Sequence, residues 1–160
     1  MPKADKLEPT RIADQLRRAF DGQAWHGDSL LEILKGVTAA QASAHPVKNA
    51  HSIWELVLHI AAWDGVARRR MTGVPVKELS ATKNFPPVTD TSNAAWTKTL
   101  EHLHQVHVEL VAAVEKFPEK SLLHQVPGKK GAHYTFYYML HGIVQHELYH
   151  AGQIALLKKV

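Results

Sequence analysis

Cysteine is absent from the 160-residue chain. Disulfide bonds, thiolate zinc sites and a cysteine nucleophile are therefore excluded. Long hydrophobic runs are also missing, because no apolar stretch approaches the roughly 20 residues that a membrane-spanning helix needs. The opening residues, Met1 to Lys6, contain no apolar segment typical of a signal peptide. We therefore expect a cytoplasmic protein with no membrane partner.

A strong excess of charge of either sign is also missing. The formal net charge is +4 at pH 7, and the isoelectric point is about 9.3. The basic residues are scattered, apart from the segments 68–70 and 129–130, which we interpret as a solvated helix end and a polar loop. Dispersed positive charge of this size does not indicate a nucleic-acid surface. No nucleic-acid partner is expected.

Apolar residues make up 45% of the chain and charged residues 21%, which is ordinary for a globular protein. We expect one domain over residues 1–160, because this length suits a single core. Apolar residues recur at helical spacing in four long segments, and no strand pattern is evident. The four predicted helices cover residues 9–22, 52–71, 92–116 and about 134 to near the end of the chain.

Four long helices predict an all-α fold, a four-helix bundle. Ser52 and Glu55 form a capping-box pattern at the start of the second helix. The connection over residues 74–90 is long for a compact domain, and such connections are often functional. It is long enough to return along the bundle, so the second and third helices can run parallel. The last helix would then be antiparallel to the second.

Histidine is abundant, with twelve residues in the chain. His146 and His150 lie four positions apart, so a helix presents both imidazoles on one face, within reach of one metal ion at about 2.0–2.1 Å. Two protein ligands rarely hold a divalent ion, so a third is expected. His59 shares an inward stripe with Leu56 and Ile60, at a matching height in an antiparallel arrangement. Three neutral imidazoles leave coordination positions open, as in catalytic sites.

The segment from His146 to His150 also matches the H-E-x-x-H pattern of zinc proteases, with Glu147 as the base. Such proteases take their third ligand from downstream. Only ten residues follow His150, and none is His, Asp, Glu or Cys. No sheet that would support a peptide substrate is predicted either. Glu147 could face solvent as readily as the metal, and we do not favour a protease.

The segments around His59 (Leu56–Trp63) and from His146 to Ile154 resemble the DinB superfamily of DinB/YfiT-like metal-binding four-helix bundles. The resemblance implies an up-down-down-up bundle, often a homodimer. It also implies that His59, His146 and His150 bind a divalent metal ion, with zinc or nickel expected first. Some relatives transfer low-molecular-weight thiols or isomerise thiol adducts, others are suspected hydrolases, and many have no known activity.

The first functional hypothesis is a metal-dependent enzyme, a thiol S-transferase or a hydrolase, acting on a small molecule, with low-molecular-weight thiols as one candidate class. The second is a non-catalytic, metal-stabilised bundle or stress-related interaction module. The third is a helical interaction domain in which the histidines merely pack. The sequence identifies no catalytic residue and no further cofactor-binding residue. Membership of a family indicates where the site lies but does not identify the reaction.

Several neighbours of the three histidines have two interpretations each. Trp63 either walls a pocket or packs in the core, and Tyr149 either donates a hydrogen bond or packs. Gln153 shares a face with His146 and is either a site residue or a surface amide. The remaining histidines are expected to be structural. In particular His102, His104 and His107 do not share a helix face, so no second metal is expected there.

Overall fold

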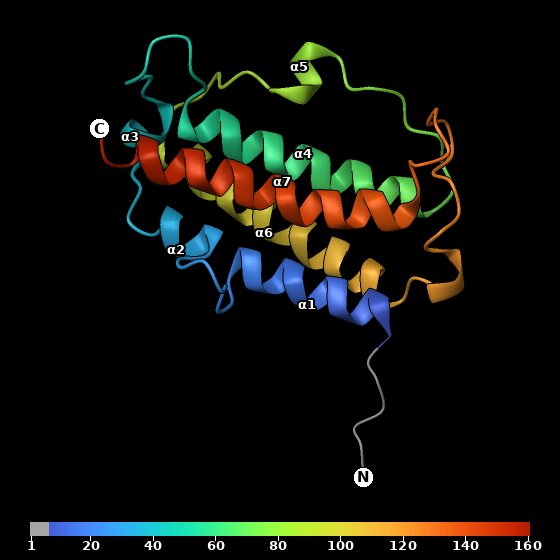
Figure 1. The fold of residues 1–160 in the computed structure, drawn as a ribbon. Helices are drawn as coiled ribbons and strands as arrows, with labels where there is room; N and C mark the ends of the chain where they lie inside the picture. The colour runs from blue at the N-terminus through green and yellow to red at the C-terminus, as the bar shows by residue number, and fades with distance from the viewer. Residues whose placement is uncertain (1–6) are drawn as a thin grey trace.

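The computed structural model describes residues 7–160, and this part of the chain is helical, with no strand (Figure 1). The prediction of an all-helical fold is therefore confirmed. The four long helices are α1 (Glu8–Phe20), α4 (Ile53–Met71), α6 (Asn93–Glu115) and α7 (Phe136–Leu157). The short elements are α2 (Leu30–Leu34), α3 (Ala39–Ser43), α5 (Ala81–Asn84) and the 3-10 turn η1 (Glu119–Ser121).

Contacts between α4 and α6 show that these two helices run in the same direction. Near their starts, the Trp54 indole N–H donates to Thr99 Oγ1 at 3.0 Å. Further along both helices, Arg68 pairs with Glu109 at 3.0 Å. The colour gradient of Figure 1 shows α1 and α7 running the opposite way, with α7 lying along α4.

Helix α4 begins where its capping residues predict. Ser52 Oγ accepts a hydrogen bond from the Glu55 backbone N–H at 3.2 Å, and the Glu55 carboxylate accepts one from the Ser52 N–H at 2.8 Å. Two backbone donors that the first helical turn cannot satisfy are thereby paired. The cap fixes where α4 starts and hence the helical face on which His59 lies.

The core between the long helices has two parts. One part surrounds Trp54 and Trp96, and the other includes Ile12, Leu16 and Leu110, all of which are nearly or fully inaccessible to solvent. Polar side chains of α4 and α7 are buried as well, and they form the sites described below. None of the helices in residues 7–160 is long and apolar enough to cross a membrane.

The end of α4 differs from the solvated helix end that the sequence predicted. Arg70 is only 1% exposed. Its guanidinium donates to the Tyr134 hydroxyl at 3.2 Å and to the Val76 carbonyl at 3.3 Å. The interpretation was wrong for Arg70, because the segments after α4 and before α7 supply hydrogen-bond partners to its guanidinium. The connection after α4 also contains α5, a short helix that no periodicity could reveal in four residues.

We predict that Ser52→Ala lowers the free energy of unfolding by about 1 kcal/mol, because the cap of α4 loses its acceptor. Urea unfolding followed by circular dichroism measures the change. Ser80→Ala is the matched control, since Ser80 precedes α5 but its side chain accepts no backbone N–H of that helix. Equal losses in the two variants would contradict the role of the Ser52 cap.

Candidate metal centre

Three histidines from two helices meet in the structure. His59 comes from α4, and His146 and His150 come from α7; one ring nitrogen of each lies within 4.8 Å of the others. The Nε2 atoms of His59 and His146 are 3.0 Å apart. Two nitrogens bound to one ion at 2.0–2.1 Å lie roughly 3–3.5 Å apart, so this spacing suits a shared ion. We call this group the three-histidine cluster.

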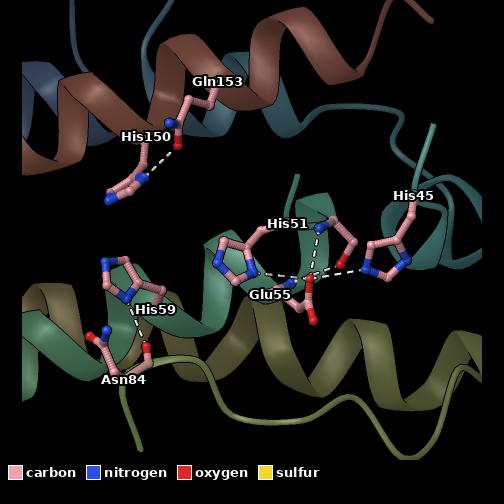
Figure 2. Close-up of polar contacts among 8 residues, drawn as sticks. His45, His51, Glu55, His59, Asn84, His150 and Gln153 are labelled. Carbon is pink, nitrogen blue, oxygen red and sulfur yellow. Dashed lines mark hydrogen bonds and ion pairs between the residues drawn. The ribbon is translucent and has the colours of Figure 1, made fainter. Parts of the chain in front are cut away.

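Hydrogen bonds fix the orientation of two of these rings (Figure 2). His59 Nδ1 lies 2.7 Å from the Asn84 carbonyl oxygen, which can only accept, so this nitrogen carries the proton. His150 Nδ1 likewise donates to Gln153 Oε1 at 2.7 Å. Figure 2 shows the remaining nitrogens of His59 and His150 facing each other across the gap between the helices. Partners of this kind set the tautomer and direction of metal-binding imidazoles.

The surroundings keep all three imidazoles neutral. Burial lowers the pKa of His59 and of His150. The pKa of His146 falls to about 3, first because of burial and then because of repulsion from its two histidine neighbours. His146 Nδ1 is buried without a hydrogen-bond partner among the described residues. Neutral imidazoles present lone pairs at pH 7, and three of them are a suitable donor set for zinc or nickel.

A cavity of about 920 Å³ adjoins the three-histidine cluster. Its volume is within the range of small-molecule sites. All three histidines contribute to its wall together with aromatic side chains and one buried cation. These further lining residues include Trp63, Arg70, Tyr134, Tyr137, Tyr138 and Tyr149.

Asn84, at the end of α5, forms hydrogen bonds with two residues that line the site, His59 and Trp63. Its backbone carbonyl accepts from His59, and its side-chain oxygen accepts from the Trp63 indole N–H at 2.8 Å. The next residue, Phe85, stacks on the His59 ring with centroids 4.1 Å apart and on His51 at 3.6 Å. Sequence reasoning missed Asn84 and Phe85. The only available signal was the unusual length of the connection that contains them.

The structure distinguishes between the two interpretations that the sequence left open for each of Trp63, Gln153 and Tyr149. Trp63 lines the cavity and lies edge-on to His59, as the pocket-wall interpretation predicted. Gln153 is a direct partner of His150 rather than a free surface amide. Core packing was the wrong interpretation of Tyr149, which is 66% exposed at the cavity edge.

Glu147 neither faces solvent nor packs beside the three histidines as a protease base would. It is fully buried on another face of α7, where its Oε1 lies 3.0 Å from His107 Nδ1 on α6. The two sequence-based interpretations of Glu147 were a position facing solvent and a position facing the metal, and His107 was expected to be a structural residue. Neither interpretation foresaw that a histidine of α6 would face an acid of α7.

We predict that His146 makes the metal-free protein less stable as the pH falls below 7, relative to a His146→Gln variant. His146 has a pKa of about 3 when folded but about 6.5 when unfolded, so below pH 6.5 the unfolded chain binds a proton that the folded chain does not. Between pH 7 and 5 this difference costs on the order of 1–2 kcal/mol. Urea unfolding at both pH values should show a smaller loss for His146→Gln. An identical loss in that variant would contradict the assignment.

Comparison with known proteins identifies the family of the chain. The sequence model of the DinB superfamily matches residues 23–154, a range that includes α4, α6, most of α7 and all three histidines. Neither the curated proteins nor the solved structures compared with the chain gave a match. The family match spans most of the chain, and the chain therefore belongs to the DinB superfamily.

Proposed function

We propose that this protein is a metal-dependent enzyme that acts on a small molecule, with His59, His146 and His150 as the metal ligands. One observation carries the proposal: three neutral imidazoles converge beside a cavity of about 920 Å³. Zinc or nickel is the expected ion, because imidazole suits both. Three protein ligands leave room for a substrate atom, unlike a closed structural site.

The bound ion would supply Lewis-acid chemistry, lowering the pKa of a water or thiol that it contacts. Residues around the cluster would orient the ligands, shield the site and contact the substrate. Asn84 and Gln153 orient the imidazoles, and Trp63 shields one side of the cluster. The exposed Tyr149 lies beside His150, with ring centroids 5.0 Å apart, where its hydroxyl can meet an incoming substrate.

We infer that the reaction is thiol S-transfer or hydrolysis, and that the substrate is a small molecule, with low-molecular-weight thiols as one candidate class. The resemblance in the two histidine segments supports these reaction classes. The proposal includes the up-down-down-up arrangement of the long helices, which is supported by the parallel pairing of α4 with α6 and the opposite direction of α7. A homodimer, a cytoplasmic location and the absence of nucleic-acid and membrane partners stay predictions.

A non-catalytic, metal-stabilised bundle is the alternative. The observation that favours it is the origin of the ligands on two different helices, because an ion held there would cross-link α4 to α7. Chelators would then lower the melting temperature, and no substrate would turn over.

We predict that the purified protein binds zinc or nickel at the three-histidine cluster and that His59→Ala strongly reduces this binding. The metal content after reloading, measured by inductively coupled plasma mass spectrometry, tests the prediction. His102→Ala is the matched control, since His102 is an exposed histidine of α6. Unchanged metal content in a His59→Ala/His150→Ala variant, beside the control, would exclude these residues as ligands.

We also predict metal-dependent turnover, assayed with thiol adducts and with esters. Activity should disappear with a chelator, return with added metal, and fall at least tenfold in His150→Ala. Tyr149→Phe should reduce the rate without reducing metal content, because it removes only a hydroxyl at the cavity edge. A metal-loaded protein that turns over neither class would support the non-catalytic alternative.

A further inference from the structure

A second group of metal-binding side chains lies inside the bundle, and we call it the Asp64 cluster. It consists of Asp64 on α4, His107 on α6 and Glu147 on α7. The two acidic residues are 0% exposed and His107 is 3% exposed. No residue is shared with the three-histidine cluster. Each of three helices therefore contributes one buried side chain that can ligate a metal ion.

Several buried polar atoms of the Asp64 cluster have no hydrogen-bond partner among the described residues. Its one hydrogen bond joins His107 Nδ1 to Glu147 Oε1 at 3.0 Å. Both oxygens of Asp64, Glu147 Oε2 and His107 Nε2 are buried with no hydrogen-bond partner among the described residues. Buried polar atoms are nearly always paired, and leaving a buried carboxylate unpaired is costly. Four such atoms in one place point to a missing partner.

We propose that the Asp64 cluster binds a second divalent metal ion, with the carboxylates of Asp64 and Glu147 and Nδ1 of His107 as ligands. A divalent ion would neutralise both carboxylates and take the place of the proton on His107 Nδ1. One imidazole and two carboxylates suit Zn²⁺, Mn²⁺ or Fe²⁺. The ion would join α4, α6 and α7, in the way that bundle cores hold metals between facing helices.

The observed distances agree with this assignment. His107 Nδ1 lies 3.0 Å from Glu147 Oε1 and 3.6 Å from Asp64 Oδ2. Ligand atoms around an ion at about 2.0–2.2 Å are separated by roughly 3–3.5 Å. The His107 ring is held in place by stacking on Phe20, with centroids 3.8 Å apart. His107 also lines a cavity of about 330 Å³, whereas Asp64 and Glu147 do not.

The test compares the zinc content of four proteins after metal removal and reloading. We expect about two equivalents in the wild type and one in His59→Ala/His150→Ala. Asp64→Asn, which keeps the side-chain shape, should bind one equivalent. The triple variant, His59→Ala/His150→Ala/Asp64→Asn, should bind none. If Asp64→Asn does not fold, as judged by circular dichroism, His107→Gln replaces it.

A second readout identifies the ligands of the bound ion. Mn²⁺ in the His59→Ala/His150→Ala protein should show coupling to a single imidazole nitrogen in pulsed electron paramagnetic resonance, and His107→Gln should abolish it. Mn²⁺ should also raise the melting temperature of the double variant but not of the triple variant.

The outcomes separate this proposal from the proposed function. One equivalent in both wild type and Asp64→Asn, with none in His59→Ala/His150→Ala, would overturn the second site and leave the three-histidine site intact. It would mean that the Asp64 cluster is a metal-free hydrogen-bonded network. One equivalent in wild type and in His59→Ala/His150→Ala, with none in Asp64→Asn, would support the second site and exclude the three-histidine site.

Discussion

The packing of α7 against α4 determines both polar sites of the protein. His146 and Glu147 are consecutive on α7, so their side chains leave the helix in different directions. One reaches His59 beside the large cavity, and the other reaches Asp64 and His107 in the interior. A change in the register of α7 would move both residues together. The register of α7 along α4 therefore has to be set to within a fraction of a helical turn. Packing in the bundle core holds this register.

Burial has a different consequence in each site. In the three-histidine cluster it removes protons, which leaves lone pairs available for a metal. In the Asp64 cluster it leaves carboxylate and imidazole atoms without a hydrogen-bond partner among the described residues, and a bound cation would be such a partner. Two adjacent residues of α7 thus belong to sites of opposite character. The first opens to a cavity and suits chemistry, whereas the second is enclosed and suits structural cross-linking of three helices.

Much of the fold was readable because it depends on local pattern. Helical periodicity located the long helices, and the capping pair Ser52–Glu55 set the start of α4. His146 and His150 could be paired from their spacing alone, and His59 required only the expectation of an antiparallel neighbour. That these residues meet was foreseen, and that they bind metal stays a prediction. The parts that could not be foreseen depend on contacts between distant segments.

Asn84 and Arg70 illustrate this limit. Asn84 acts through its backbone carbonyl, which every residue possesses, so no sequence pattern distinguishes it. The guanidinium of the buried Arg70 donates to the Val76 carbonyl and to the Tyr134 hydroxyl, and the contact with Tyr134 follows from tertiary packing. The partnership of Glu147 with His107 likewise required the relative rotation of α6 and α7. Periodicity gives the inward face of each helix but not which inward residues touch.

Crystals of the zinc-loaded protein, with data collected on both sides of the zinc absorption edge, test the central claim most directly. We expect an anomalous peak about 2.0–2.1 Å from Nε2 of His59, His146 and His150. A fully loaded crystal with no peak among these three nitrogens would contradict it, and the converging imidazoles would then be a packing feature.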